Sequence, residues 1–419
     1  MRPNHNQDKQ THNPERALVT ARREFGEHGG VAPSICRAST FTVLESGTMP
    51  EIFSGTQGPD QGGCFLYSRH FNPTVNVLAR YLAAMEGSEF AACTASGMAA
   101  ISATLLQICK QGDHIVSSNT VYGGTHALLA DLIPDMGIET TFVDPSDTEA
   151  FAKAIGPNTK VFYTELLGNP TLKVADIPAL AELAHKHDIK LVVDNTFTPL
   201  LFSPKQLGAD IVIYSMTKFI NGASDVIAGA VCADTEFVGR LMDLHTGRLM
   251  LLGATMDPRV AFDLIQRLPH LAIRMREHSR RASAIAHHLA NMGLPVGYPG
   301  LSSHPQHERF MSMMNEGYGY GGMLTLDCGT NDVANQLMNE LQNTEHFGLI
   351  AVSLGYFDTL MSCSGSSTSS EIPVNEQRAM GLSSGLLRLA IGYTGVLEDH
   401  IEKITRAVSK VGLTTQKQA

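Results

Sequence analysis

Between residues 89 and 234, short apolar segments alternate with segments whose apolar side chains recur at helical spacing. Segments of the first kind favour buried strands and cover 89–96, 114–119, 138–144, 160–166, 189–195, 209–218 and 228–234. Segments of the second kind predict helices at 97–113, 123–137, 147–156 and 176–188. Strands that alternate with helices form βαβ units, so we expect an α/β fold whose mostly parallel sheet is covered by helices on both faces.

The pattern changes after residue 256. Residues 258–293 predict a long helix that is interrupted near Pro269, because proline breaks the helical hydrogen-bond ladder. A strand at 321–329 and a helix at 331–343 then indicate a second, smaller α/β domain. The first 70 or so residues show little periodicity and many Gly and Pro, which is typical of an extended arm with a disordered start. We expect an arm (1–70), a large domain (71–270) and a C-terminal α/β domain (271–419).

The 419 residues carry a formal net charge of −10, with a sequence pI of about 5.9. Nucleic-acid and anionic-membrane surfaces need clustered Lys and Arg, so this balance argues against both kinds of partner. The seven cysteines stand singly, without metal-ligand spacing, which favours reduced thiols in a cytoplasmic protein and no metal site. The polar N-terminal residues do not resemble a signal peptide, and no apolar run approaches the roughly 18 residues of a membrane span.

Polar side chains follow one expected strand directly. The segment SMTKFINGASD (215–225) places Ser215, Thr217 and Lys218 after the apolar run ADIVIY. Such residues are often only turn or cap residues beside a solvent-exposed lysine. The functional alternative is a lysine that binds a carbonyl cofactor covalently, next to hydroxyls that hold the phosphate group of that cofactor.

Two further strand ends fit the same cofactor. TASGMAA places Ser96, Gly97 and Met98 at the start of a helix, where backbone N–H groups attract anions, although a plain helix cap is the alternative. Asp194 ends the apolar strand IKLVVD and needs a partner, either a nearby cation or N–H group or the protonated ring nitrogen of pyridoxal phosphate. Parallel strands end at one edge of a sheet, so one pyridoxal phosphate would explain all three signals. No GxGxxG or GxxxxGK[ST] motif stands here, which argues against dinucleotides and nucleoside triphosphates.

A longer series of motifs gives these positions a family resemblance. The series is YSRHFNPT (67–74), EGSEFAACTASGMAAI (86–101), VYGGT (121–125), LGNPT (167–171), VVDNTFTP (192–199), SMTKFINGASDVIAGAV (215–231), VSLGYFDTLM (352–361) and GLLRLAIG (385–392). In their order along the chain they resemble the Cys/Met-metabolism, or trans-sulfuration, family of pyridoxal-phosphate enzymes of fold type I. HTGRLMLLGATMDPRVAF (245–262), YPGLSSHPQHERF (298–310), YGYGGMLTLD (318–327) and GYFDTLMSCSGSSTSSE (355–371) are most similar to plant-type methionine γ-lyases.

The resemblance implies roles for the residues around the cofactor. Lys218 aligns with the lysine that binds the cofactor covalently and then moves protons. Tyr122 aligns with the tyrosine that stacks on the cofactor ring and serves as a general acid toward the leaving thiol. Asn169 aligns with the contact to the ring 3-oxygen, and Asp194 with the partner of the ring nitrogen. Positions that align with the phosphate site are Ser96, Gly97, Met98, Ser215 and Thr217.

The resemblance also implies how substrate and subunits are arranged. Arg388, assisted by Ser353, aligns with the clamp on the α-carboxylate of an amino-acid substrate, which suits the two-pronged guanidinium group. Tyr67 and Arg69 align with a pair that reaches the cofactor phosphate of the neighbouring subunit. We therefore expect at least a dimer with shared active sites, and more specifically a homotetramer formed from two such dimers.

The expected reaction is γ-elimination on a sulfur amino acid, with L-methionine giving methanethiol, 2-oxobutanoate and ammonia. Cystathionine γ-lyase, cystathionine β-lyase and O-acylhomoserine sulfhydrylase are the alternatives among enzymes, and a cofactor-binding module without turnover is the alternative outside them. The segment GYFDTLM (355–361) suggests a mostly apolar substrate wall that includes Tyr356, Leu360 and Met361, with Asp358 as its one acid. Such a wall suits a thioether better than cystathionine.

Three positions depart from the pattern of the family. Gly124 replaces the Cys that bacterial methionine γ-lyases typically carry, which puts the preference for methionine in most doubt and suggests a roomier pocket. Ala223 and Thr368 stand where His is common.

Overall fold

A computed structural model of the chain describes residues 12–54, 56–58, 65–363, 377 and 381–413. Its largest element is a seven-stranded sheet between Phe90 and Ala233, in the order β1-β7-β6-β5-β4-β2-β3. The strands are β1 (Phe90–Thr94), β2 (His114–Ser118), β3 (Glu139–Val143), β4 (Thr159–Glu165), β5 (Lys190–Asp194), β6 (Ile211–Ser215) and β7 (Gly229–Ala233). β2, β3, β4, β5 and β6 pair in parallel, and β7 is antiparallel to both β6 and β1. Apart from β7, the strands therefore end at the same edge of the sheet, as the sequence predicts.

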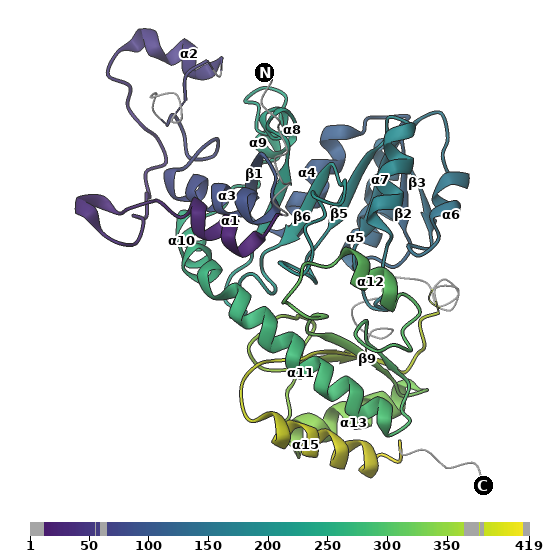
Figure 1. The fold of residues 1–419 in the computed structure, drawn as a ribbon. Coiled ribbons are helices and arrows are strands. Elements are labelled where there is room, and N and C mark those ends of the chain that lie inside the picture. The colour runs from purple at the N-terminus through teal and green to yellow at the C-terminus, as the bar shows by residue number, and fades with distance from the viewer. Residues whose placement is uncertain (1–11, 55, 59–64, 364–376, 378–380, 414–419) are drawn as a thin grey trace, which may run out of the picture.

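Helices cover both faces of this sheet (Figure 1). Apolar side chains of α3 (Pro73–Glu86), α7 (Ile177–Lys186) and α10 (Pro258–Arg267) pack in the core on one face. Those of α4 (Gly97–Ile108) and α8 (Thr235–Leu241) pack in the core on the other face. The remaining helices of this part are α5 (Gly123–Ala127), α6 (Thr148–Lys153) and α9 (Arg248–Leu252).

Two predicted helices differ from the expected ranges. α4 ends at Ile108 rather than near residue 113, because Cys109 is extended and Gly112 adopts a φ of +90° in the turn before β2. The segment 123–137 is not one α-helix. It continues from α5 into a π-helical turn (Leu128–Leu132) and then into a 3₁₀ turn (Pro134–Met136). The 3₁₀ turn begins at Pro134 because proline lacks the N–H that an α-helix would need there.

A long helical segment leads from the large sheet to a second sheet. α10 is followed by a 3₁₀ turn (Leu268–His270) and by α11 (Leu271–Asn291), so the predicted interruption at Pro269 is confirmed. In Figure 1, α11 runs beside the second sheet. The described part of residues 296–390 forms five strands in the order β10-β11-β12-β9-β8. They are β8 (Val296–Gly297), β9 (Met323–Asp327), β10 (Leu349–Ile350), β11 (Leu360–Cys363) and β12 (Leu386–Ala390).

The second sheet has a core of its own, to which apolar side chains of α11, α13 (Asn331–Asn343) and α15 (Leu397–Lys410) contribute. α12 (His307–Met313) instead places Phe310 in the core of the large sheet. The predicted strand at 321–329 and helix at 331–343 correspond to β9 and α13. The domain boundaries remain a prediction.

The N-terminal segment extends away from the large sheet (Figure 1). It contains α1 (Pro14–Ala21), α2 (Met49–Phe53) and two 3₁₀ turns (Glu27–Gly29 and Ser46–Thr48). The sequence pattern does not reveal α1, which has only eight residues. Asn13 caps this helix, and Leu18 is buried in the large core. Among the described residues, no helix combines the length and the apolar character needed to cross a bilayer.

Candidate active site

A cavity of about 270 Å³ opens where the strands of the large sheet end. Its walls come from both sheets, because the loop before β11 and strand β12 also reach it. Ten of the predicted site residues line it: Ser96, Gly97, Met98, Tyr122, Asn169, Asp194, Ser215, Thr217, Lys218 and Arg388. Residues as far apart as 96 and 388 in the sequence thus share one cavity.

Lys218 lies in the turn directly after β6. Its Nζ donates a hydrogen bond to Oγ of Ser353, at 3.1 Å. Burial and, to a smaller extent, the nearby Arg388 charge together lower the pKa of Lys218 to about 8. The amine is therefore partly neutral near neutral pH, as a nucleophile or proton acceptor must be.

Arg388 enters the cavity from β12 and is almost fully buried. Nη1 donates to Oδ1 of Asn169 at 2.9 Å, and Nη2 donates to the backbone oxygen of Ser353 at 3.3 Å. Burial lowers the pKa of Arg388 to about 10, although the Glu165 carboxylate opposes this shift. The guanidinium group stays charged near neutral pH, and Ser353 joins it to Lys218.

Two carboxyl groups are buried at neighbouring strand ends. Asp194 ends β5 and Glu165 ends β4, and the two residues are paired in the strand register. Burial raises the pKa of both, and the Asp194 charge raises that of Glu165 further. Asp194 accepts a hydrogen bond from the backbone N–H of Thr196 at 2.9 Å. No Lys, Arg or His in the described part of the chain forms an ion pair with Asp194.

Glu165 is a site residue that the sequence reasoning missed. Its Oε1 accepts from the backbone N–H of Tyr122 at 2.6 Å, and its Oε2 accepts from that of Asn169 at 2.9 Å. One carboxylate therefore ties together two loops that line the cavity. A signal for it exists in the sequence, because the apolar run KVFYTE (160–165) ends in an acid, just as IKLVVD does.

The start of α4 and the end of β6 form a close-packed corner. Ser96 caps the helix by accepting from the N–H of Ala99 at 3.1 Å. A Cβ atom added at Gly97 would lie 2.7 Å from Cβ of Ser215, so position 97 must be glycine for the backbone to approach the Ser215 hydroxyl. Backbone N–H groups of a first helical turn and adjacent hydroxyls bind phosphate well.

Tyr122 and Gly124 stand at the start of α5. The Tyr122 side chain is 46% exposed and lines the cavity. A Cβ atom added at Gly124 would lie 2.6 Å from Cε1 of Tyr122. The Tyr122 ring thus occupies space that any side chain at position 124 would need.

Tyr67 and Arg69 do not line this cavity. The Arg69 guanidinium lies over the Tyr67 ring, 5.5 Å from its centroid, and donates to the backbone oxygen of Met250 at 3.3 Å. Tyr67 is 44% exposed. Their expected role in a neighbouring subunit stays a prediction.

The expected substrate wall is wrong in its residues. Leu360 and Met361 are buried in the two cores, and Tyr356 packs against Phe357 instead of lining the cavity. Asp358 accepts a hydrogen bond from the Thr394 hydroxyl. The apolar side chains that do line the cavity are Ile101, Leu167, Phe197, Ile227, Val352 and Leu354. Of the family departures, Ala223 lies outside the cavity lining and Thr368 lies outside the described residues.

Comparison with known proteins identifies the family to which the chain belongs. Residues 16–409 match the profile of a family described as Cys/Met metabolism PLP-dependent enzymes. The chain belongs to this family. The cofactor of this family member is therefore pyridoxal phosphate, as the strand-end residues predict.

Individual relatives give the same result. A methionine γ-lyase from Arabidopsis thaliana is 52% identical over 94% of this chain and 90% of that protein. A cystathionine γ-lyase from Bacillus subtilis is 36% identical over 82% of this chain and 89% of that protein. The solved structure of a putative O-acetylhomoserine (thiol)-lyase from Campylobacter jejuni, with N′-pyridoxyl-lysine-5′-monophosphate, is 27% identical and superposes with a TM-score of 0.86. It covers 95% of this chain and 100% of that one. The predicted fold type I is thereby confirmed.

The residues of this family member fit the cofactor. Asp194 is a buried carboxyl group that forms no ion pair with any described Lys, Arg or His, and a protonated pyridine nitrogen would supply such a cation. Gly97 leaves the helix start open beside Ser215, which suits a phosphate group. Lys218 has a lowered pKa, which suits covalent attachment to an aldehyde.

Proposed function

We propose that this protein cleaves L-methionine by γ-elimination to methanethiol, 2-oxobutanoate and ammonia. The observation that carries the proposal is the pairing, through Ser353, of a half-buried lysine and a buried arginine in the wall of a largely apolar cavity. The similarity to a methionine γ-lyase over 94% of the chain supports it. When bound, pyridoxal phosphate would supply an electron sink for negative charge at the substrate Cα.

In this proposal Arg388 orients the substrate. Its planar guanidinium would hold the α-carboxylate by two parallel hydrogen bonds, and Ser353 would assist. Asn169 accepts from Nη1 and so fixes the plane of the guanidinium. The α-carboxylate would then be held beside Ser353, whose Oγ accepts from Lys218 Nζ.

Lys218 moves protons in this proposal. Its Nζ would take the Cα proton, which the lowered pKa of about 8 permits near neutral pH. A proton must also leave Cβ before the γ-substituent departs, and Nζ could take it only after giving up the first proton. Ser353 Oγ would hold the amine in place between these transfers.

Asp194 and Tyr122 complete the proposed assignments. Asp194 would keep a proton on the ring nitrogen, and the loss of its own solvation would be offset by that ion pair. Glu165 holds the loop of Tyr122 through a backbone hydrogen bond. The Tyr122 hydroxyl would then protonate the sulfur of the departing methanethiol.

The proposed phosphate site uses the corner between α4 and β6. The backbone N–H groups of Gly97 and Met98, with the hydroxyls of Ser215 and Thr217, would bind the phosphate, and Ser96 would fix the helix start through its cap. In this structure the Thr217 hydroxyl already accepts from the N–H of Ala228 at 3.0 Å. It also donates to the backbone oxygen of Ala228 at 3.3 Å, so donation to a phosphate would replace that bond.

An assay of product release decides which amino acid is the preferred substrate. We would compare 2-oxobutanoate release from L-methionine, L-homocysteine and L-cystathionine with pyruvate release from L-cystathionine. The proposal predicts the largest kcat/KM for methionine, because the side chains listed above line the cavity with apolar surface. Much faster cleavage of cystathionine than of methionine would leave the lyase class standing and refute the substrate.

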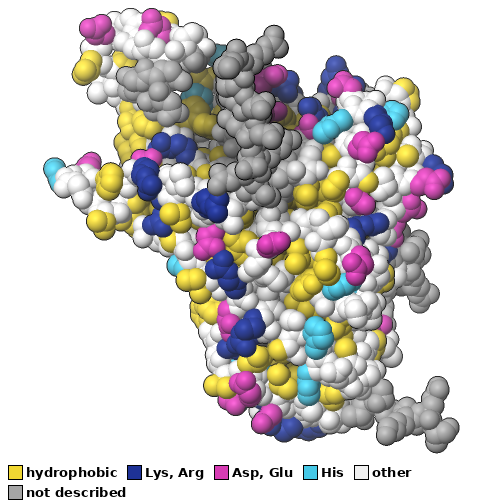
Figure 2. Space-filling model, viewed as in Figure 1, with side chains coloured by type: hydrophobic (Ala, Val, Ile, Leu, Met, Phe, Trp, Pro, Cys, Tyr) yellow, Lys and Arg dark blue, Asp and Glu magenta, His cyan; other side chains and the backbone are white. Residues whose placement is uncertain are grey.

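We also propose that the protein is a cytoplasmic homotetramer of two dimers with shared active sites. The six cysteines in the described part of the chain form no disulfide with one another. The N-terminal segment exposes large apolar side chains that a neighbouring subunit would cover, among them Phe25, Val31 and Leu44. Figure 2 shows apolar side chains on this projecting segment, while acidic and basic side chains are interspersed over the rest of that face. An active monomer in sedimentation at assay concentration would refute the shared site.

A further inference from the structure

One face of α11 is polar although it is buried. Arg274, His278 and Arg281 follow each other at positions i, i+4 and i+7, so they lie on the same side of the helix. Each is less than 8% exposed. Core-facing positions of this spacing are usually apolar, because a buried polar group must find partners.

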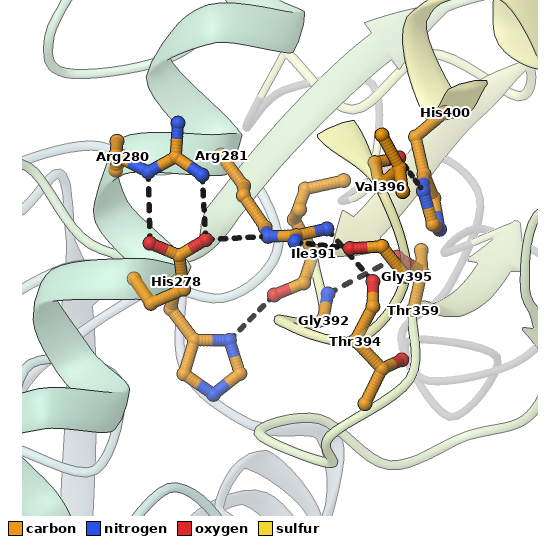
Figure 3. Close-up of polar contacts among 11 residues, drawn as sticks. His278, Arg280, Arg281, Thr359, Ile391, Gly392, Thr394, Gly395, Val396 and His400 are labelled. Atoms are coloured by element: carbon orange, nitrogen blue, oxygen red, sulfur yellow. Dashed lines mark hydrogen bonds and ion pairs between the residues drawn. The ribbon is translucent and has the colours of Figure 1, made fainter. Parts of the chain in front are cut away.

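The two arginines bind backbone carbonyl groups in the two segments that follow Lys218 and Arg388. Arg274 donates to the carbonyls of Phe219 and Ile220, which directly follow Lys218. Arg281 donates to the carbonyls of Thr394 and Gly395, in the segment after β12 (Figure 3). α11 therefore contacts both the turn of Lys218 and the segment that follows β12, the strand that carries Arg388.

His278 lies between these two sets of contacts and touches both sides. Its ring meets the Phe219 ring edge-on, with centroids 5.1 Å apart, and the Tyr393 ring in the same way at 5.0 Å. Its Nδ1 donates to the backbone oxygen of Ile391 at 2.6 Å, as Figure 3 shows. Burial lowers the pKa of His278 to about 4, so the ring is neutral near neutral pH. Nε2 has no hydrogen-bond partner among the described residues.

The packing around His278 leaves little room for movement. A Cβ atom added at Gly322 would lie 3.0 Å from Cβ of His278 and 3.3 Å from the Phe219 ring. A Cβ atom added at Gly355 would lie 2.5 Å from the backbone nitrogen of Phe219. Close-packed interiors transmit displacements instead of absorbing them. A change at His278 would therefore move the Lys218 turn or the end of β12.

We propose that His278 is a positioning residue that sets the separation of Lys218 from Arg388. Phe219 is the neighbour of Lys218, and Ile391 stands three residues after Arg388. The ring contact with Phe219 fixes the Lys218 turn, and the hydrogen bond to Ile391 fixes the end of β12. The inference rests on the roles proposed for Lys218 and Arg388, and it makes His278 part of their geometry without contact to the substrate.

Two substitutions separate the contacts. His278→Phe keeps a ring against Phe219 but removes the donor to Ile391, and His278→Asn keeps an N–H donor but removes the ring. We would purify both with pyridoxal phosphate bound, and measure cofactor content, kcat and KM for methionine, and the visible circular dichroism of the bound cofactor. His288→Asn is the matched control, because His288 lies on the same helix but bonds to Thr405 of α15.

We expect both variants to retain the cofactor and to lose between about 10- and 100-fold in kcat/KM, the range that a misplacement of about 1 Å produces. Their circular dichroism should change, because it reports how the protein holds the cofactor, while His288→Asn should match the wild type. Values within twofold of the wild type would overturn the proposal. The proposal would also be overturned if the His278 variants lost thermal stability only as much as His288→Asn does and kept the kcat and KM of the wild type.

If neither variant folds, Phe219→Leu decides, since it keeps the hydrogen bond to Ile391 and removes only the ring contact. A fall of about tenfold or more in kcat/KM supports the proposal, and an unchanged value overturns it. If the wild type does not cleave methionine at all, the proposed function fails separately. The circular dichroism of the His278 variants still decides whether His278 positions the cofactor site.

Discussion

The two sheets contribute to one cavity in different ways. The large sheet supplies residues at the last positions of its parallel strands, in the loops that follow them and at the start of α4. The smaller sheet supplies Arg388 from within β12, where the register places it between Ser362 of β11 and Thr325 of β9. Loop groups at strand ends suit a large cofactor, whereas a side chain fixed by two neighbouring strands suits one small anionic group.

This difference implies a division of labour. Substitutions on the large-sheet side should change turnover and the state of the cofactor. Substitutions on the small-sheet side should mainly change the affinity for the substrate. Kinetics can test the division, because kcat and KM report the two sides separately when chemistry limits turnover.

The largest expected effect comes from Lys218→Ala. Loss of a proton-transfer group typically costs about 10²–10⁴-fold in rate, and here the same nitrogen would also bind the cofactor. The fold and some cofactor binding should persist, because the proposed phosphate contacts remain. The measurement is 2-oxobutanoate release, with cofactor content determined on the same sample.

Lys190→Ala is the control for this variant, since Lys190 is exposed and begins β5, at the end of that strand remote from Asp194. It should retain full activity. Full activity of Lys218→Ala itself would refute the entire assignment of the site.

Arg388→Lys tests the opposite side of the cavity. Lysine keeps the positive charge but loses the planar fork, so one of two charged hydrogen bonds to the carboxylate is lost. Such a bond contributes about 1.5–3 kcal/mol, which corresponds to a rise in KM of about 10- to 100-fold. Arg406→Lys on α15, whose partner Glu345 is remote from the cavity, should leave KM unchanged. A fall in kcat at constant KM would contradict the division between the sheets.

Sequence reasoning reaches the large-sheet side more easily than the small-sheet side. Ser215, Lys218 and Asp194 stand at the ends of apolar strands, and the parallel arrangement alone brings such ends together. Arg388, by contrast, lies within LLRLA, and nothing in that pattern says which cavity it enters. It is found through the family resemblance.

Glu165 and the segment 355–361 show what the sequence pattern cannot predict. Glu165 also ends an apolar strand, yet its burial depends on β4 lying between β2 and β5, an order that the sequence does not state. The wall expected at 355–361 fails for a related reason. Strand pairing and packing decide which way Leu360 and Met361 point, and both point into cores.

Gly124→Cys should have a smaller and more specific effect. The added Cβ would meet the Tyr122 ring at 2.6 Å, so the ring must rotate, and the space beside the leaving group changes. We expect the wild type to cleave ethionine as well as methionine. The variant should change the ratio of their kcat/KM values by up to about tenfold, the lower range for one methylene in an apolar pocket.

Cofactor content should change less than this ratio in Gly124→Cys, since the three atoms nearest to an added Cβ all belong to the Tyr122 ring. Gly239→Cys in α8 is a matched control, because no atom lies within 4 Å of a Cβ added there. An unchanged ratio for ethionine and methionine, together with loss of cofactor, would show that position 124 acts on the cofactor side instead.

The smallest effect on turnover is expected at a buried acid outside the cavity. Glu86, at the end of α3, accepts hydrogen bonds from the Tyr214 hydroxyl and from the backbone N–H of Lys205. Burial raises its pKa from the ordinary 4.5 to about 8. Between these two values the folded protein holds a proton that the unfolded chain releases, so this group stabilises the fold at low pH and its contribution is lost as pH rises toward 8.

Glu86→Gln should remove that pH dependence. The amide has the same shape and stays neutral, so the melting temperature of the variant relative to the wild type should rise steadily from pH 5 to pH 8, while kcat with methionine stays close to the wild-type value. Glu182→Gln is the control, because the exposed Glu182 pairs with Lys186 and its pKa is lowered, which predicts no gain at high pH. A melting-temperature difference for Glu86→Gln that is flat between pH 5 and pH 8 would mean that Glu86 is ionised in the fold. Its hydrogen bonds with Tyr214 and Lys205 would then stabilise a buried carboxylate. Buried charge next to the large sheet would in that case not be confined to the strand ends.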